Sequence, residues 1–324
     1  MHSFAPRRRL VLAALAAAGV APALVAQESA GSIRLIVPAT AGASVDALAR
    51  LVADALSGIM EVPVRIENIP GDGGVTGTNA IARAPNDGSV IGMAVSSPMI
   101  GGKLLSRNAR FNPIEDFDWL ALLGTYPNAM VVASRSNVTT FEQWLAAAKS
   151  AGAPMSYGTF GTGSPGHLAG AFLRLDHGAN LRHVSLPVMD EGYSMLSNGR
   201  LDVLFDGLPN AIEELPRSGH RIVAVTSSAR LPAFPDVPAF GELFQQSFVV
   251  WVGLVLPKGV PAATYAKLAG AVSVLLTEPR HAEGMRGAGV AFMGLSGSGT
   301  RSFVESEFLR NARLIARLND QGLR

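Results

Sequence analysis

The chain of 324 residues contains no cysteine. This absence excludes disulfides, thiolate metal sites, a cysteine nucleophile and a lipid anchor attached through cysteine. Charged residues are also scarce, at 16% of the sequence, whereas hydrophobic residues reach 48%. Such a composition is typical of a globular protein rather than a disordered one, and the length suits one large core or two medium ones. Without disulfides, the stability of the fold must come from packing.

The N-terminus has the pattern of a secretory signal. Arg7, Arg8 and Arg9 precede an apolar run from Leu10 to Ala26, and no acidic residue occurs before Glu28. This order of a basic and an apolar region predicts a signal peptide over residues 1–26, exported by the Sec or the twin-arginine route. The alternative is a membrane anchor, but the run is shorter than the ~20 apolar residues of a span. We therefore expect a periplasmic protein.

Removal of the signal changes the charge balance. The whole chain has 27 Lys and Arg against 25 Asp and Glu. Without Arg7–Arg9, 27 − 3 leaves 24 basic residues against 25 acidic ones, so the mature chain is close to neutral. Nothing in this balance favours nucleic acid as a partner.

Strand-like and helix-like segments alternate along the chain. The apolar run Ile33–Val37 is followed by helical spacing over Ser44–Leu56, and further strands are expected at Val62–Glu67 and Val90–Val95. The pattern restarts at Ala129–Ala133. We expect later strands at 155–160, 201–205, 221–226 and 251–256, with helices at 139–150, 164–175, 262–276 and 302–318. Two of these helices open on capping boxes, Thr139 with Glu142 and Ser302 with Glu305.

This alternation predicts an α/β fold with sheets covered by helices on both faces. A break near Tyr126-Pro127 and a return near Val250 divide the chain into two lobes. We expect lobe one to contain residues 31–127 and 250–324, and lobe two residues 128–249. Because the chain crosses between the lobes twice, the crossovers form a hinge.

A glycine loop, Gly161-Thr162-Gly163-Ser164-Pro165-Gly166, follows the strand that ends near residue 160. It matches G-x-G-x-x-G, so an NAD-dependent enzyme is one hypothesis. Against it, Pro165 cannot donate an N–H, the motif lies in mid-chain, and no acidic residue ends a clear second strand about 20 residues on. The alternative is a carboxylate cradle, with Ser164 as N-cap and Pro165 as first helical residue. An ordinary strand–helix turn is also possible.

The loop Pro38–Asp46 has the same pattern in lobe one. Gly42 and Ala43 are small, Ser44 is a candidate N-cap, and Asp46 either compensates the helix dipole or holds a ligand or water. Ser96 and Ser97 either supply hydroxyls to the cleft or form a plain turn. None of these loops contains Lys or Arg, so a bound anion would depend on backbone N–H groups and hydroxyls. One loop supplies too little free energy for micromolar binding, which predicts a cleft that closes from both sides.

The sequence gives little support to the hypothesis that the protein is an enzyme. Ser164, His167 and Asp206 resemble a triad in composition, but Ser164 and His167 share one helical turn, so the imidazole would not easily reach the hydroxyl. The histidines show no metal-binding spacing. We expect a binding protein with no catalytic residue, metal or cofactor.

Several segments together resemble the periplasmic receptors of tripartite tricarboxylate transporters, the Bug receptors. The resemblance runs from Ile33 almost to the C-terminus. The segments that carry it are Ile36–Pro38 through Asp46–Arg50, Val64–Asn68 with Pro70-Gly71 and Gly73-Gly74, Ala84–Gly88, Asp116-Phe117, Pro127-Asn128, Tyr157–Thr159 through His167–Gly170, Gly199–Asp202 with Phe205-Asp206, and Ala224–Ser227 with Arg230 and Pro235–Pro238.

The resemblance implies a type II-like periplasmic binding protein that delivers a small carboxylate to membrane permease subunits. It places the ligand carboxylate on backbone groups and ordered water of the first loop, and it completes the site with the second-lobe loop and Asp206. We therefore expect a monomer whose ligand-binding residues are Ala41, Gly42, Ala43, Ser44, Asp46, Ser96, Ser97, Asn128, Thr159, Gly161, Thr162, Gly163, Ser164, His167 and Asp206. A receptor that feeds a sensor instead of a permease is the alternative.

Two departures from the family pattern concern the ligand. The family usually has Pro-Gly-Gly where this chain has Ala41-Gly42-Ala43, and the methyl group of Ala43 narrows the approach to the backbone. A Tyr-Lys-Gly stretch commonly follows the His-Val-Pro segment, whereas this chain has Leu186-Pro187-Val188 after His183-Val184-Ser185. The exchange of a charged edge for an apolar one favours a more apolar acid.

Overall fold

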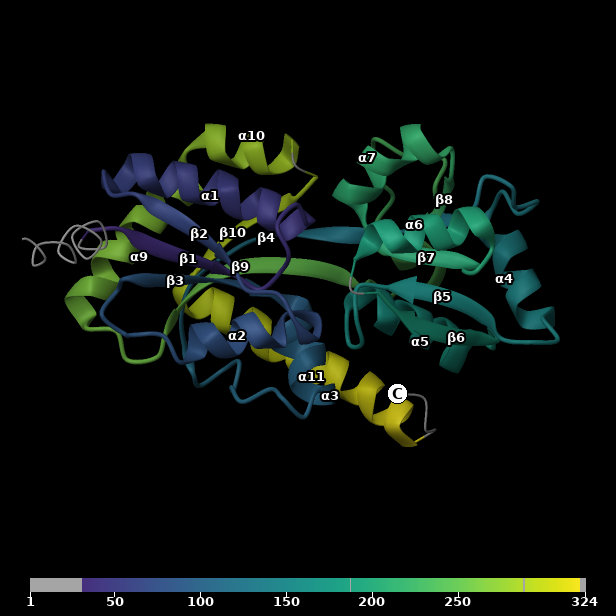
Figure 1. The fold of residues 1–324 in the computed structure, drawn as a ribbon, viewed down its shortest axis with the longest axis horizontal. Coiled ribbons are helices and arrows are strands. Elements are labelled where there is room, and N and C mark those ends of the chain that lie inside the picture. The colour runs from purple at the N-terminus through teal and green to yellow at the C-terminus, as the bar shows by residue number, and fades with distance from the viewer. Residues whose placement is uncertain (1–30, 187, 288, 321–324) are drawn as a thin grey trace, which may run out of the picture.

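The structure, a computed structural model, describes residues 31–186, 188–287 and 289–320. Figure 1 shows two α/β lobes side by side, with long strands passing from one lobe to the other. The predicted fold class, two lobes with mixed sheets, helices on both faces and two strand crossovers, is confirmed. The expected signal peptide over residues 1–26 and Pro187 lie outside the described residues.

The lobe-one sheet has the order β2-β1-β3-β9-β4, and β10 is added along β4. Its strands are β1 (Ile33–Val37), β2 (Val64–Asn68), β3 (Val90–Val95), β9 (Val249–Pro257), β10 (Ala291–Ser296) and the first part of β4 (Phe117–Val132). The first three strands are parallel, whereas β9, β4 and β10 add in antiparallel pairs.

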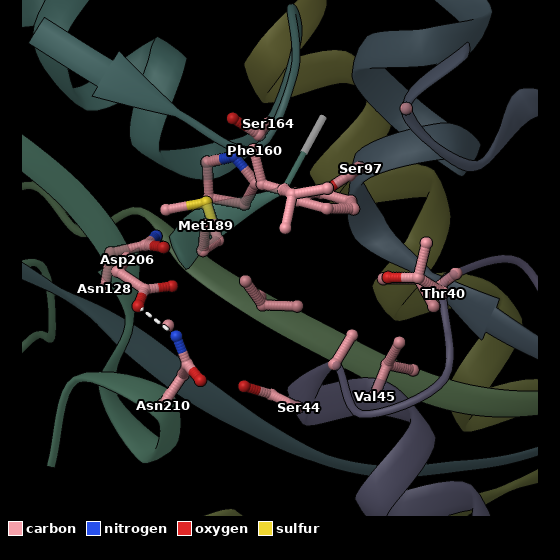
Figure 2. A pocket seen from close by; sticks show the side chains of 18 of the residues that line it. Thr40, Ser44, Val45, Ser97, Asn128, Phe160, Ser164, Met189, Asp206 and Asn210 are labelled. Carbon is pink, nitrogen blue, oxygen red and sulfur yellow. Dashed lines mark hydrogen bonds between the residues drawn. The ribbon is translucent and has the colours of Figure 1, made fainter. Parts of the chain in front are cut away.

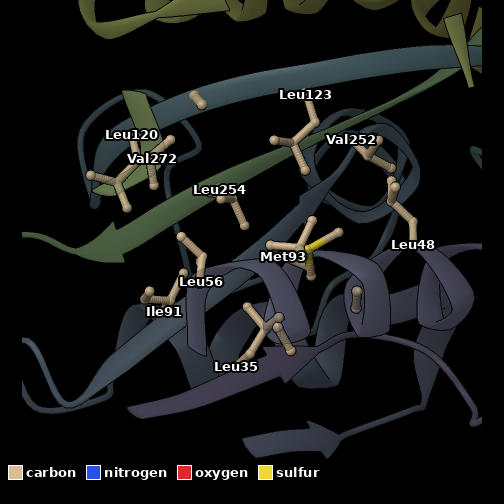
Figure 3. Close-up of a cluster of buried hydrophobic side chains, with 14 of the residues drawn as sticks. Leu35, Leu48, Leu56, Ile91, Met93, Leu120, Leu123, Val252, Leu254 and Val272 are labelled. Carbon is tan, nitrogen blue, oxygen red and sulfur yellow. The ribbon is translucent and has the colours of Figure 1, made fainter. Parts of the chain in front are cut away.

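Apolar side chains cover both faces of this sheet. Successive residues of β1 alternate between the two clusters: Leu35 and Val37 pack on one face, and Ile36 packs on the other. On the first face, shown in Figure 3, α1 (Ser44–Met60) and α9 (Ala262–Thr277) supply Leu48, Leu56 and Val272. On the second face lie α2 (Val75–Ala82) and the start of α11 (Gly297–Asp320). Because helices cover both faces of the sheet, β3 is buried at every position. This explains why its sequence is a continuous apolar run without alternation.

The lobe-two sheet has the order β6-β5-β7-β4, and β8 also pairs with β4. Its strands are β5 (Met155–Thr159), β6 (Leu181–Ser185), β7 (Val203–Gly207) and β8 (Arg221–Val225), with β5, β6 and β7 parallel. The helices of this lobe are α4 (Phe141–Ser150), α5 (Pro165–His177), α6 (Met189–Asn198), α7 (Leu208–Ser218) and α8 (Phe240–Phe244). They bury two apolar clusters, one on each face of the sheet.

One strand belongs to both lobes. Residues Phe117–Pro127 of β4 pair with β9, whereas Asn128–Val131 pair with β7. The change of partner between Pro127 and Asn128 is where the polypeptide passes from the first sheet to the second. The return is made at the start of β9, where Val249 still pairs with Pro127. The crossover strands therefore lie next to each other, as a hinge requires.

A long C-terminal helix also reaches both lobes. Val304 of α11 packs into a lobe-one cluster, but Ile315 and Leu318 of the same helix pack into a lobe-two cluster. Arg317 forms an ion pair with Asp176 of α5 in lobe two. In Figure 1 this yellow helix runs along the lower side of the molecule from lobe one toward lobe two.

Several local predictions differ from the structure. The sequence pattern did not predict the first part of β4, α10 (Pro279–Gly287), β10, or the π-helical turn η2 (Ser97–Gly102) that leads into α3 (Lys103–Leu105). The predicted capping box of α4 is shifted by one residue, because Thr140 accepts from the Gln143 N–H. Helix α11 begins at Gly297, so the predicted cap Ser302 lies inside the helix.

Candidate functional site

A hollow of about 250 Å³ lies between the lobes, and we call it the inner cavity. The loop after β1, the end of β3 and Tyr126 form its lobe-one wall. Asn128, the loop after β5, the start of α6 and the end of β7 form its lobe-two wall. A second hollow of about 640 Å³, the outer cleft, adjoins it and shares Thr40, Phe160 and Val188. The inner cavity therefore needs both lobes to exist.

Asp46 determines the shape of the lobe-one loop. One of its oxygens, Oδ2, accepts from the Gly42 N–H at 2.9 Å, and the other, Oδ1, accepts from Asn68 Nδ2 at 2.8 Å. Arg50 donates to the same carboxylate from one turn further along α1. Burial opposes ionisation of Asp46, but these hydrogen bonds and the Arg50 charge outweigh it and lower the pKa of the carboxyl. Asp46 does not line the cavity; it holds the loop from behind.

The N-terminus of α1 faces the inner cavity without a side-chain cap. Its N-cap is Ala43, not the predicted Ser44, and Ala43 has no side chain that could accept from the first turn. Ser44 is instead the first helical residue, and Figure 2 shows its hydroxyl at the edge of the hollow. The Asp46 N–H donates to the Ala43 carbonyl at 2.8 Å, so the N–H groups of Ser44 and Val45 are those that remain for an anion or for water.

The lobe-two loop has the cap that the sequence predicts. Ser164 is the N-cap of α5, its hydroxyl accepts from the His167 N–H at 3.2 Å, and Pro165 is the first helical residue. The His167 Nδ1 atom accepts from the Gly163 N–H at 3.0 Å, and Thr159 contacts both Ser164 and His183 through its hydroxyl. Only Ser164 and Pro165 of this set line the inner cavity. The others support the loop from inside lobe two.

Two buried histidines behind this loop make the fold sensitive to acid. Burial lowers the pKa of His167 to about 4, and burial together with His167 lowers the pKa of His183 to about 3. In the folded protein each histidine has a pKa below the ordinary value of 6.5. The contribution of these uncharged histidines to the free energy of unfolding is therefore present above pH 6.5 and is lost as the pH falls toward 4. Between pH 7.5 and pH 5, each histidine should reduce the free energy of unfolding by about 2 kcal/mol.

We expect His167→Gln to remove one of these contributions, because the glutamine oxygen can accept from Gly163 N–H without taking up a proton. Urea unfolding at pH 7.5 and pH 5 should show a pH-dependent loss of stability about 2 kcal/mol smaller than that of the wild type. An unchanged loss would show that His167 is not the titrating group.

Asp206, at the end of β7, is a buried carboxylate that forms no ion pair with any of the residues the structure describes. Its Oδ2 accepts from Tyr193 Oη at 2.9 Å and from Asn210 Nδ2 at 2.5 Å. Burial raises the pKa of Asp206 to about 6, although the hydrogen bonds from Asn210, Tyr193 and the Gly207 backbone N–H lower it. Figure 2 shows Asp206, Asn128 and Asn210 together on the lobe-two side of the cavity. The side-chain Nδ2 of Asn128 is buried and has no hydrogen-bond partner among the described residues.

Four helix N-termini meet at this cavity. The N-caps of α1, α5, α6 and α7 all line it, and these are Ala43, Ser164, Val188 and Gly207. Only Ser164 caps its helix with a side chain. No Lys, Arg or His occurs among the described lining residues. The partial positive charges of the four helices are therefore the main attraction for an anion.

The structure gathers about half of the sequence-predicted ligand residues around the inner cavity. These are Ala41, Gly42, Ala43, Ser44, Ser97, Asn128, Ser164 and Asp206. Gly161 and Thr162 line the outer cleft. The remaining five do not line either hollow: Asp46 and His167 support loops, Thr159 is buried, the Ser96 hydroxyl accepts from the Trp251 N–H, and Gly163 touches Gly101.

Other lining residues were not predicted. Val45, Phe160 and Met189 form much of the apolar surface, and Thr40, Asp190 and Asn210 add polar groups. Val188 and Leu186 of the segment that departs from the family pattern do reach the hollows, since Val188 lines both and Leu186 the outer cleft. For Asn210, the only feature of the sequence that could have indicated a role in the site is its position one helical turn after Asp206.

The geometry supports neither the hypothesis of an NAD-dependent enzyme nor that of a catalytic triad. At Gly163, an added Cβ atom would lie 2.6 Å from the Gly101 backbone, so another part of the chain fills the space that a pyrophosphate would need. Ser164 donates to Thr159, and the Nδ1 of His167 is occupied by the Gly163 N–H, so no proton relay connects them. Within the described ranges, no three His, Asp or Glu side chains form a group that could hold a metal. None of the described helices is both long and apolar enough for a membrane span.

Comparisons with known proteins agree with this architecture. The family model for the tripartite tricarboxylate transporter family receptor matches residues 48–320. A UPF0065 protein of Agrobacterium vitis is 31% identical over 294 residues, which cover 85% of this chain and 83% of the relative. BugT of Bordetella pertussis is 26% identical over 305 residues, with 93% and 94% covered.

Solved structures show the same fold. A structure described as a periplasmic transporter has a TM-score of 0.80 at 27% identity, with 89% of this chain and 97% of the other covered. An R. palustris protein with adipate has a TM-score of 0.81 at 25% identity, with 87% and 95% covered.

Two α/β lobes around a shared cavity, joined by adjacent strands, define a periplasmic binding protein. The chain belongs to the tripartite tricarboxylate transporter receptor family, which includes the Bug receptors. Members of this family are solute-binding receptors rather than enzymes. The resemblance stated from the sequence is thus confirmed.

Proposed function

We propose that this protein binds a small carboxylate in the inner cavity and delivers it to a tripartite membrane permease. The observation that carries the proposal is the convergence of four helix N-termini on a cavity without a cationic side chain. Three of these helices have no side-chain cap, so first-turn N–H groups remain for a ligand. The adipate found in the R. palustris relative is a ligand of this chemical kind.

Closure of both lobes supplies the free energy that one loop lacks. Hydrogen bonds to a charged group contribute about 1.5–3 kcal/mol each, and ordering of the complex costs about 4 kcal/mol or more. Micromolar affinity requires about 8 kcal/mol net, so N–H groups from both walls and exclusion of water are needed. In the cell, this function requires export, for which residues 1–26 have the sequence pattern, and a monomer that presents both lobes to the permease.

A thermal-shift panel tests the binding function. Mono-, di- and tricarboxylates and NAD are added separately to the purified protein after bound solutes have been removed by unfolding and refolding. A true ligand at 100 times its Kd should stabilise the fold by about 2.7 kcal/mol. We expect stabilisation by at least one carboxylate and none by NAD. A response to NAD alone would overturn the proposal, and loss of solute uptake in a deletion strain tests delivery separately.

A further inference from the structure

The charges of the inner cavity are distributed unequally between its two walls. Among the residues that the structure describes, Asp190 and Asp206 are the only charged ones that line this cavity. Both belong to the lobe-two wall. Asp190 lies in the first turn of α6 and is exposed. The lobe-one wall, in contrast, presents the uncapped N-terminus of α1 and no charged side chain. The lobe-two wall also carries the N-termini of α5, α6 and α7, but Asp190 lies in the first turn of α6 and Asp206 directly precedes the N-cap of α7. These two carboxylates offset the partial positive charges of α6 and α7, so an anion is attracted more strongly to the α1 end of the cavity.

Asp206 accepts from two side chains and from the Gly207 backbone N–H, and one of its oxygens has no side-chain donor among the described residues. The residue is only 4% exposed, and both of its side-chain hydrogen bonds, from Tyr193 and Asn210, reach Oδ2. No described side chain donates to Oδ1, and no described Lys, Arg or His lines the cavity to neutralise the carboxylate. Since burial raises the pKa of Asp206 only to about 6, the group is mainly ionised at pH 7.5. A buried acceptor of this kind calls for a hydrogen-bond donor.

Apolar side chains surround the space between these two ends. Figure 2 shows Phe160 and Met189 on one side of the hollow and Val45 near Thr40 and Ser44 on the other. Phe205, Val188 and Val250 complete the apolar lining. The cavity therefore has an anion-binding end, an apolar middle and an acidic end.

We infer that the ligand is a monocarboxylate whose far end is not an anion and carries a hydrogen-bond donor, such as an amide, a hydroxyl or an ammonium group. This inference rests on the proposed function, because it assumes that the ligand carboxylate binds at α1. A dicarboxylate of the same length would place its second charge next to Asp190 and Asp206 with no cation to offset the repulsion. Among carboxylates, this chain should therefore select against dianions.

Calorimetric titration of matched acids tests the inference. The probes are succinate and its monoamide succinamate, adipate and its monoamide adipamate, and 6-aminohexanoate and 6-hydroxyhexanoate, all at pH 7.5. At the chain length that binds best, we expect the monoamide to bind at least about tenfold more tightly than the dicarboxylate. Equal or tighter binding of the dicarboxylate would overturn the inference while leaving the proposed function intact. If no carboxylate binds, either here or in the wider panel, the proposed function itself fails.

Variants of the two acidic residues identify the cause of the selectivity. Asp206→Asn should reduce the preference for the monoamide at least about fivefold, with adipate binding gained and adipamate binding lost. Asp190→Asn, at an exposed position, should change the preference in the same direction and serves if Asp206→Asn does not fold. Asp54→Asn, at an exposed position of α1 outside the cavity, is the matched control and should change nothing. An unchanged preference in both Asp190→Asn and Asp206→Asn would contradict the inference.

Discussion

Replacement of Ala43 by aspartate is expected to raise the stability of the ligand-free protein and to remove ligand binding. Ala43 is the N-cap of α1, has extended backbone angles of φ −69° and ψ 157°, and cannot cap the helix with its own side chain. An aspartate there can accept from the first-turn N–H groups, which adds about 0.5–2 kcal/mol of stability. The same carboxylate would occupy the place of the ligand anion.

The loss of affinity should be large because two negative charges would share one helix end. At a separation of 4 Å, their repulsion is about 4 kcal/mol with an effective dielectric constant of 20. We therefore expect at least about a 100-fold weaker affinity, measured by calorimetry with the best carboxylate of the panel. Urea unfolding of the ligand-free variant measures the gain in stability.

Ala43→Asn separates charge from volume. Asparagine caps the helix nearly as well but carries no charge, so it should stabilise the protein and weaken binding much less than aspartate. Equal losses for the two variants would mean that the side-chain volume blocks the cavity. Wild-type affinity in Ala43→Asp would mean that the anion binds elsewhere.

Replacement of Gly101 by alanine is expected to prevent full closure of the lobes. Gly101 belongs to η2 of lobe one, and its backbone lies against Gly163 of the lobe-two loop. An added Cβ atom would lie 1.9 Å from the Gly163 carbonyl oxygen and 2.4 Å from its Cα atom. No contact of this length can persist, so the two loops must separate. Because both walls must meet to enclose the inner cavity, the variant should bind ligand about 10- to 100-fold more weakly, which corresponds to the ~1–3 kcal/mol that overpacking costs.

Small-angle scattering provides the second measurement for this variant. With saturating ligand, the wild type should show a smaller radius of gyration than the ligand-free protein, whereas Gly101→Ala should show little change. The thermal stability of the ligand-free variant should stay close to that of the wild type, because the clash exists only when the lobes are in contact. Gly270→Ala in α9 is the control, since a Cβ atom there meets nothing within 4 Å. Wild-type affinity and compaction in Gly101→Ala would show that this contact is not part of closure.

The elements that could be predicted from the sequence are those with a short-range cause. Ser164 followed by Pro165 is a local capping pattern, and the structure confirms it in full. At α1 the same reasoning placed the cap one residue late, because Ala43 takes the cap position while Asp46 ties back the loop through Gly42. A residue without a capping side chain leaves no local signal. The absence of cations from the loops was visible in the sequence, and it remains true of the described cavity lining.

The elements that could not be predicted depend on distant partners. Strand β4 is buried along nearly all of its 16 residues and pairs with four different strands, so its first part shows no alternation of apolar and polar residues. Helix α11 contributes to the cores of both lobes, which no periodicity within the helix could reveal. The supporting roles of Thr159 and His167 depend on contacts within lobe two that close only after folding.

The sequence by itself determined the alternation of strands and helices, and it predicted a site whose loops contain helix ends and no cationic side chain. These properties follow from composition and from interactions within a few residues. Only the tertiary structure decided that four helix N-termini, two of them never singled out from the sequence, meet at one cavity. It also decided that Asp206 lies there with no cationic side chain among the described lining residues. Strand order and the approach of the lobes fix those positions, and both depend on contacts between residues far apart in the chain.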